Sequence, residues 1–290
     1  MSEVKCKLCE ANTTPLFDVN AYQLYKCISC GFVFVFPDPD GQTIENHYAT
    51  NYYANEARYH QVNNGEFRLW NKRIQMVENY LPSEIKNRKD ILDIGCATGI
   101  FLKAAQNRDW DIYGIEHSEY AVQQAQIRLG VGGNIYCCNL QNFESEKKFL
   151  AVSAWDVIEH VTTPLFFLEK AYSLLQDDGI FSFSTVNTSS LNHLLFGKNW
   201  RYYTPPEHLS YFNLRNLKQM LDQTGFELLK TRTIFNYQAF LDGINRRYRL
   251  SLEPNKFIKS LLFPSKIISE WFGYGDIVEI WTKKIPSHHP

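Results

Sequence analysis

The sequence predicts an α/β protein built on a doubly wound, mostly parallel sheet, with a small N-terminal module and a helical cap. Three observations predict this fold. Two CxxC pairs lie in the first thirty residues, an aromatic-rich helical pattern covers residues 67–81, and strand-like and helix-like runs alternate from residue 90 onward. The expected domains are residues 1–38, residues 39–88, and a main domain at 89–290 with an insertion near 240–270.

Composition narrows the function classes. The 290 residues carry a net charge of −1, and no block of Lys and Arg is long enough to follow a phosphate backbone, so nucleic acid is not an expected partner. The N-terminus lacks an apolar leader, and no run approaches the roughly 18–20 apolar residues of a membrane span. We therefore expect a soluble, cytoplasmic protein with no membrane span.

The N-terminal module has the spacing of a metal site. Cys6 and Cys9 form one CxxC pair and Cys27 and Cys30 the other, with seventeen residues between the pairs. This spacing is typical of a four-thiolate zinc ribbon, and no nearby His or Asp completes an open, catalytic site. We therefore expect a structural zinc ribbon at 1–38, with "YQLYKC" and "GFVFVF" as its strands. Two disulfides or four unrelated thiols are the alternatives.

Residues 39–88 are expected to form a helical cap. "PDPDG" at 37–41 breaks the chain and marks the boundary. Apolar residues then recur three to four apart and predict a helix that ends before Pro82; they are Phe67, Trp70, Ile74, Val77 and Leu81. Upstream, Tyr48, Tyr52 and Tyr53 either roof a ligand or form a structural aromatic cluster.

The main domain alternates between two kinds of apolar pattern. "DILDIG", "DIYGIE", "NIYCCN", "LAVSAWDVI" and "GIFSFSTVN" resemble strands, and the segments between most of them resemble helices. Such alternation predicts parallel strands joined by right-handed crossovers. Ligands of these sheets bind beyond the carboxyl ends of the strands.

The stretch "DILDIGCATGIFL" indicates which ligand. Gly95 and Gly99 follow the first strand, where a missing side chain lets a ligand approach the backbone, and Glu116 ends the second strand, where a carboxylate can hold ribose hydroxyls. The dinucleotide fingerprint GxGxxG is absent, and Asp93 would repel a pyrophosphate. A nucleoside with an ammonium and a sulfonium fits this acidic loop, and S-adenosylmethionine is such a compound.

Residues 90–235 resemble the class I S-adenosylmethionine-dependent methyltransferases, whose fold is Rossmann-like. "LDIGCATG" resembles their glycine loop, "YGIEHS" their ribose-binding strand end and "SAWDVIEHV" their fourth strand. Ala97 stands where the family often has Gly, and Asn139 where many members have Asp. The resemblance implies a cofactor site made of Asp93, Gly95, Cys96, Gly99, Glu116, His117, Asn139, Leu140 and Asp156. For Gly99, close packing of a helix on a strand is the structural alternative.

The resemblance also implies how the sheet closes. "GFELLKTRTIF" and "GDIVEIWTKK" have the composition of the antiparallel hairpin that ends the family's sheet. The insertion between them is expected to be helical. Its Arg246, Arg247 and Arg249 either bind an anionic substrate group or form a solvated helix face.

The acceptor side is expected in "NWRYYTPPEHLSYFN", residues 199–213. Together with the zinc module, "EHLSYF" is similar to the zinc-containing methyltransferases of deoxysugar and natural-product pathways, including sugar C-methyltransferases. The resemblance implies catalytic roles for His208 and Glu207. The tyrosine expected three residues before the histidine is Pro205 here, so Tyr203, or Tyr202, is the substitute. O-methylation with His208 as base and C-methylation both stay open, as does a merely loop-organising His208.

A second constellation is Asp156, Glu159 and His160 in "DVIEH". It resembles a divalent-metal triad of ubiquinone-type O-methyltransferases, where an ion would lower the pKa of a hydroxyl. The alternative is that Glu159 and His160 start a helix.

The expected function is methyl transfer from S-adenosylmethionine to a small polar acceptor: a sugar nucleotide, polysaccharide precursor or secondary metabolite. A structural Zn²⁺ and a homodimer are further expectations. One alternative is a non-catalytic binding or regulatory module that docks through the ribbon. Another is an NAD-dependent oxidoreductase, which the missing fingerprint disfavours.

Overall fold

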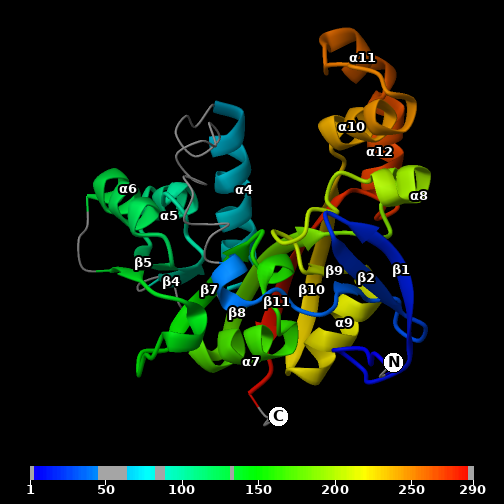
Figure 1. Cartoon of the computed structure of the whole chain (residues 1–290). Coiled ribbons are helices and arrows are strands. Elements are labelled where there is room, and N and C mark those ends of the chain that lie inside the picture. Colours follow the sequence, from blue (N-terminus) through cyan, green and yellow to red (C-terminus); the bar gives the residue numbers. More distant parts are fainter. Residues whose placement is uncertain (1–2, 45–63, 82–88, 131–133, 287–290) are drawn as a thin grey trace.

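A computed structural model describes residues 3–44, 64–81, 89–130 and 134–286, which form two sheets and their covering helices (Figure 1). The larger sheet has seven strands: β4 (Asp90–Ile94), β5 (Asp111–Glu116), β6 (Ile135–Cys137), β7 (Phe149–Trp155), β8 (Leu175–Val186), β10 (Phe226–Ile234) and β11 (Ile277–Lys284). All five residues of β4 and all seven of β7 are buried, which explains why both strands are mainly apolar.

The strand order of this sheet is β10-β11-β8-β7-β4-β5-β6. The pairs from β8 through β6 are parallel, whereas β11 lies antiparallel between β10 and β8. The expected doubly wound sheet is thereby confirmed, together with its closing antiparallel pair. Because the chain leaves β4 in one direction and returns to place β7 on the other side, the switch point lies between these two strands.

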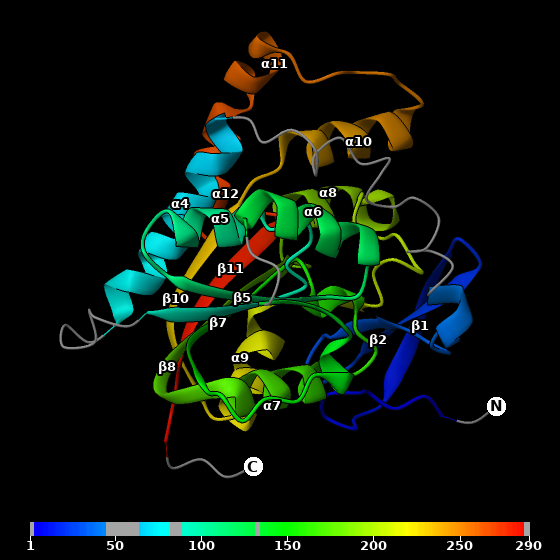
Figure 2. The ribbon, with the colours of Figure 1, turned by 90° about the vertical axis from the view of Figure 1, so that its left-hand side faces the viewer.

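Helices cover both faces of the sheet (Figure 2). On one face lie α4 (Asn64–Tyr80), α5 (Ile100–Gln106) and α6 (Glu119–Leu129), and on the other lie α7 (Pro164–Leu174) and α9 (Leu214–Gln223). A separate hydrophobic core fills each interface. Burial of these apolar stripes is the main term that holds the layers together.

Helix α4 is the part of the expected cap that the structure describes. It buries Ile74 and Val77 against α5 and the sheet, as the apolar spacing predicted. Arg73 is 3% exposed, lies between the rings of Trp70 and Trp155, and donates from Nε to Glu279 Oε1 at 2.8 Å. Residues 45–63, which hold Tyr48, Tyr52 and Tyr53, and residues 82–88 lie outside the described residues.

The N-terminal module forms a second, antiparallel sheet in the order β1-β2-β3-β9. Its strands are β1 (Thr13–Val19), β2 (Tyr22–Cys27), β3 (Val33–Val35) and β9 (Ser210–Tyr211). Strand β9 comes from the segment after His208 and pairs Val33 with Tyr211. The module is therefore joined to the main domain by a shared sheet.

The remaining helices gather at one corner of the molecule (Figure 1): α8 (Leu191–Phe196), α10 (Tyr237–Tyr248), α11 (Lys256–Leu261) and α12 (Phe263–Trp271). Three of them make up the insertion before β11. Within the described ranges, no helix has both the length and the hydropathy to cross a bilayer.

Candidate active site

The loop between β4 and α5 is shaped by two glycines with positive φ. Gly95 has φ +70°, and a Cβ there would lie 2.8 Å from Cγ2 of Val157. Gly99 has φ +77° and starts α5, where a Cβ would lie 3.1 Å from the Ala125 side chain of α6. Gly99 therefore also serves close helix packing. A side chain at either position would disturb the loop.

Backbone hydrogen bonds tie this loop to β5. The N–H groups of Gly95 and Cys96 both donate to the carbonyl oxygen of Ile115, at 2.8 and 3.1 Å. The Cys96 side chain is buried and packs against Gly114, where an added Cβ would lie 2.7 Å from its Sγ. Burial raises the pKa of the Cys96 thiol well above its usual value. Cys96 therefore contributes its backbone, rather than its thiol, to the surface of this loop.

Glu116 ends β5 and holds the loop from the other side. Its carboxylate accepts the N–H of Ala97 at 3.1 Å and that of Ser118 at 3.0 Å, and His117 Nδ1 lies 2.9 Å from Oε1. Burial raises the pKa of Glu116, but the interactions with His117 and the two N–H groups outweigh it, so its pKa lies below the ordinary value. Ala97 has φ +46°, a conformation that glycine adopts more easily.

Two further carboxyl groups flank the loop. Asp93 of β4 is buried and accepts a hydrogen bond from Ser153 Oγ at 2.6 Å. Burial raises the pKa of Asp93 to about 7, and the nearby charge of Glu116 adds to that effect. Asp156 follows β7 with φ +56°, is exposed, and accepts from Ser184 Oγ at 2.8 Å.

These three carboxyl groups give the switch point an acidic character. Asp93, Glu116 and Asp156 come from or directly follow adjacent strands, at their carboxyl ends. Oxygen acceptors and negative charge suit the hydroxyls of a ribose and a cationic group, whereas a diphosphate would be repelled. The arrangement therefore fits a positively charged nucleoside.

The expected adenine contacts lie beyond β6. Asn139 is exposed and starts a 3₁₀ turn at Leu140–Asn142. The N–H of Cys138 donates to the Glu116 carbonyl oxygen at 2.9 Å, so this turn is held next to the strand end that carries Glu116. Asn139 and Leu140 therefore lie next to the expected ribose site at Glu116.

The acceptor side centres on two histidines. The rings of His160 and His208 meet edge to face with centroids 4.8 Å apart. His208 Nδ1 lies 2.9 Å from the Tyr202 carbonyl oxygen, and His160 Nδ1 lies 2.8 Å from that of Glu207. Because a carbonyl can only accept, each Nδ1 carries the proton and each Nε2 the lone pair. Burial, and then His208, lower the pKa of His160 to about 3.

Glu159 completes this cluster. It is buried, and its Oε2 accepts from Thr185 Oγ1 at 3.0 Å. Burial raises its pKa well above the usual value, with Asp156 adding to the effect. One ligand atom each from Glu159, His160 and His208 lie within 4.8 Å of one another, so these three side chains could hold a cation. The expected triad named Asp156 where this group has His208.

The two tyrosines of the acceptor segment differ in their surroundings. The Tyr202 ring lies parallel to that of His208, with centroids 6.3 Å apart, and its hydroxyl accepts from Asn236 at 2.7 Å. The Tyr203 hydroxyl instead meets His193 Nε2 at 2.9 Å in a separate core around the ribbon sheet. Burial raises the pKa of both phenols, so both stay protonated at neutral pH and neither can accept a proton from a substrate.

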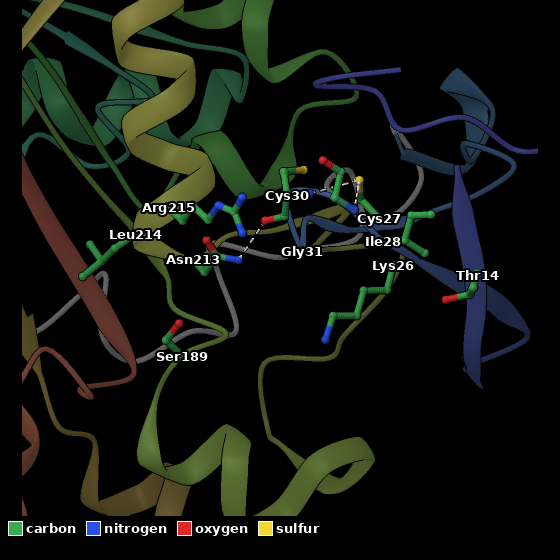
Figure 3. A pocket seen from close by; sticks show the side chains of 11 residues that line it. Thr14, Lys26, Cys27, Ile28, Cys30, Gly31, Ser189, Asn213, Leu214 and Arg215 are labelled. Carbon is green, nitrogen blue, oxygen red and sulfur yellow. Dashed lines mark hydrogen bonds between the residues drawn. The ribbon is translucent and has the colours of Figure 1, made fainter. Parts of the chain in front are cut away.

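The N-terminal module supports the His208 segment directly. The Val35 N–H donates to the Leu209 carbonyl oxygen at 3.0 Å, and the Leu209 N–H donates to that of Glu159 at 2.8 Å. Asn213 Nδ2 donates to Cys30 O at 3.4 Å, beside a pocket of about 650 Å³ that Lys26 and Arg215 also line (Figure 3). This link was not predicted from the sequence, although the β-prone run "LSYF" indicates a short strand.

The four cysteines of the module converge as their spacing predicted. Cys6 Sγ lies 3.7 Å from Cys30 Sγ, and Cys9 Sγ lies 3.5 Å from Cys27 Sγ. Zn–S bonds of about 2.3 Å in a tetrahedron put the sulfurs about 3.8 Å apart, so this geometry fits zinc. The hydrogen bond between Cys6 and Cys30 lowers the pKa of Cys6 to about 5 and raises that of Cys30, so the two sulfurs share a proton that a metal ion would displace.

Comparisons with known proteins find related sequences. A family profile described as a methyltransferase domain matches residues 66–231, more than half of the chain. The ubiquinone biosynthesis O-methyltransferase of Bradyrhizobium diazoefficiens is 23% identical over 152 residues, which are 47% of this chain and 60% of the relative. The malonyl-[acyl-carrier protein] O-methyltransferase 1 of Ilyobacter polytropus is 22% identical over 209 residues, 67% of this chain and 77% of the relative.

A solved structure shows the same fold. An S-adenosylmethionine-dependent methyltransferase of Thermotoga maritima has a TM-score of 0.53 and 20% identity, covering 83% of this chain and 99% of its own. The match with the Bradyrhizobium relative spans only about 60% of that protein's length. The Rossmann-like methyltransferase fold expected from the glycine loop is thereby confirmed.

Proposed function

The chain belongs to the methyltransferase-domain family, and from that premise we propose that it transfers a methyl group from S-adenosylmethionine to a hydroxyl of a small polar acceptor. The observation that carries the proposal is the acidic surroundings of the Gly95–Gly99 loop, beside which the carboxyl groups of Asp93 and Glu116 are buried. These surroundings suit a cationic nucleoside and disfavour the diphosphate of a dinucleotide.

The chain's own residues would hold the cofactor in parts. Glu116 would take the ribose hydroxyls, Asn139 and Leu140 the adenine, and Asp156 the amino group, while Gly95 and Gly99 leave room for the methionine portion. The cofactor supplies an electrophilic methyl group on a positively charged sulfur. A buried carboxylate at Asp93 adds negative charge behind that group, which strengthens binding of a cation.

His208 is the proposed general base. Its Nδ1 proton is held by the carbonyl oxygen of Tyr202, which leaves the lone pair on Nε2 to accept a proton. His160 has a pKa of about 3 and stays neutral beside His208. A neutral neighbour does not repel the positive charge that His208 gains when it takes the proton of the acceptor. Glu207 orients His160 through its backbone carbonyl. The Tyr202 ring forms one wall of this arrangement.

The acceptor class is a sugar nucleotide, a polysaccharide precursor or a secondary metabolite. A four-cysteine N-terminal module fused to a methyltransferase sheet supports this class, because zinc-containing methyltransferases of sugar and natural-product pathways combine such a module with a similar histidine segment. We assign one structural Zn²⁺ to the four cysteines. The ion would stabilise the module that carries β3, the strand with which β9 pairs.

Calorimetry with S-adenosylmethionine and S-adenosylhomocysteine tests the cofactor assignment. We expect saturable binding of both at sub-millimolar concentration, and no change in NADH fluorescence on mixing. Binding of NADH without binding of either adenosyl compound would refute the proposal. Methyl uptake from labelled cofactor by a panel of nucleotide sugars then tests the acceptor class.

Two substitutions separate a chemical from a structural role of His208. His208→Ala removes both ring nitrogens, whereas His208→Asn keeps a donor at the place of Nδ1 that can reach the Tyr202 carbonyl oxygen. Loss of a general base lowers turnover roughly 10²-fold or more in both variants, with cofactor affinity retained. Normal turnover in the Asn variant would make His208 a loop-organising residue.

A further inference from the structure

Helix α12 has its apolar side on the outside. Ser269 is the only buried residue of the helix, at 1% exposure, while Trp271 is 82% exposed and Ile268 is 56% exposed. The polar side faces the protein: the Glu270 carbonyl oxygen accepts from Thr233 Oγ1, and its Oε1 accepts from the N–H of Phe235. A helix packed on its own domain normally shows the opposite orientation.

The exposed apolar surface continues over the neighbouring segments. From residue 246 to residue 272, Ser269 is the only residue that is buried. We call this surface the arm. Its large exposed apolar side chains are Tyr248, Leu250, Leu252, Phe257, Leu261, Phe263, Ile267, Ile268, Trp271 and Phe272. Leu194 and Leu195 of α8 extend it, since Arg247 donates to the Leu195 carbonyl oxygen at 2.9 Å.

The arm is also positively charged. Residues 246–272 contain six Lys or Arg and two Asp or Glu, a net charge of +4, in a chain whose overall charge is −1. Lys256 and Lys259 lie on α11 with the exposed Phe257 and Leu261, and Arg246 and Arg249 stand at the end of α10. Among the described residues, these four cations have no ion-pair partner.

We propose that the arm docks on an anionic lipid surface, lying along it without crossing it. Aromatic and aliphatic side chains beside Lys and Arg are the composition of helices that lie in a membrane interface. Anionic headgroups attract each cation near the surface, and the apolar side chains enter the boundary between headgroups and acyl chains. This docking does not depend on the proposed methyl transfer.

Charge decides between a lipid surface and a second copy of the chain. Two arms facing each other would bring two clusters of charge +4 together, and each copy would leave its four unpaired cations without partners. An anionic surface satisfies both the cations and the apolar side chains. The Arg246, Arg247 and Arg249 cluster thereby acquires a role outside the acceptor site.

Vesicle flotation with the full chain tests the proposal. We expect binding to vesicles of phosphatidylcholine with about one third phosphatidylglycerol to exceed binding to pure phosphatidylcholine by at least ~10-fold, because each cation near the surface contributes about 5-fold. The difference should shrink in high salt. Binding by neither kind of vesicle would overturn the proposal, as would equal binding to both.

Matched variants locate the contact. Phe257→Ser with Trp271→Ser should lower vesicle binding ~10-fold or more, and Lys256→Glu with Lys259→Glu should abolish the preference for anionic vesicles. Ile127→Ser is the apolar control, because Ile127 is 75% exposed on α6, outside the arm. Lys218→Glu on α9 is the charge control.

Circular dichroism and cofactor calorimetry verify that each variant is folded. If Ile127→Ser or Lys218→Glu weakens vesicle binding as much as the arm variants, the arm is not the contact. If the chain binds neither kind of vesicle but sediments as a dimer, and Trp271→Ser dissociates that dimer, the arm contacts a second copy of the chain and the proposal is wrong.

Discussion

Asp93→Asn tests whether the buried carboxyl of β4 sets the pH dependence of cofactor binding. The amide keeps the shape of the side chain and still accepts from Ser153 Oγ, but it cannot ionise. Burial raises the pKa of Asp93 to about 7, above the usual value near 3.8. The carboxyl is therefore protonated in the folded chain below pH 7 and ionised above it.

The magnitude follows from that pKa. About one tenth of the Asp93 side chains are ionised at pH 6 and about nine tenths at pH 8, so affinity for a cationic ligand that needs the carboxylate rises about tenfold between them. The effect on folding has the opposite sign. Below the pKa that Asp93 has in the unfolded chain, its full contribution to the free energy of unfolding is present. That contribution falls as pH rises and is lost above the folded pKa of about 7, a change on the order of 4 kcal/mol.

Calorimetric titration with S-adenosylmethionine at pH 6, 7 and 8 measures the first effect, and urea unfolding at pH 5 and 8 measures the second. The comparison with Asp93→Asn cancels the titration of the ligand's own amino group, because both proteins meet the same ligand. The affinity of the variant for the cofactor should change less with pH than that of the wild type. The difference in the free energy of unfolding between the variant and the wild type should favour the variant more at pH 8 than at pH 5. Identical profiles in the two proteins would refute the reasoning.

Three further predictions concern the loop, the ribbon and the core. Gly95→Ala should abolish cofactor binding because its Cβ would meet Val157, whereas Gly130→Ala, with a similar φ and open space, should cost about 1 kcal/mol of stability and leave calorimetric affinity unchanged. Elemental analysis should find about one zinc per chain, and Cys27→Ser should lose the metal and lower both Tm and turnover; a folded, metal-free protein of full activity would contradict this role. Glu279→Ala should lower the free energy of unfolding by about 3–5 kcal/mol in urea titrations, because it leaves Arg73 buried without its hydrogen-bond acceptor; a loss below about 1 kcal/mol would show that the ion pair is not needed.

The parallel core of the fold was predictable because its strands are buried on both faces. "DILDI" and "FLAVSAW" are mainly apolar and do not alternate strictly between apolar and polar residues, and each becomes a fully buried strand. The glycine loop was predictable for a different reason: Gly95 and Gly99 both need positive φ, and their spacing from Glu116 follows from the length of one crossover helix. Local chemistry and periodicity carry this information.

Contacts between distant segments could not be read from periodicity. Arg73 and Glu279 are 206 residues apart, and neither α4 nor β11 carries a local sign of the other. The two-residue strand β9 is too short to show alternation, so its pairing with β3 was missed. The grouping of His208 with Glu159 and His160 depends on hydrogen bonds that join residues 207–209 to Glu159 and His160, which lie almost fifty residues earlier in the chain. The apolar pattern of α12 was typical of a helix but did not indicate which side faces solvent.

The shared sheet has a practical consequence for anyone who shortens this protein. Removing the first 38 residues would delete β3 and leave Ser210 and Tyr211 as an unprotected edge two residues beyond His208. The donor to the Leu209 carbonyl oxygen, Val35, would disappear with it. A fragment that begins at α4 would therefore keep the loop and carboxyl groups proposed to bind the cofactor but lose the strand that supports His208. We expect such a fragment to bind the cofactor without catalysing methyl transfer.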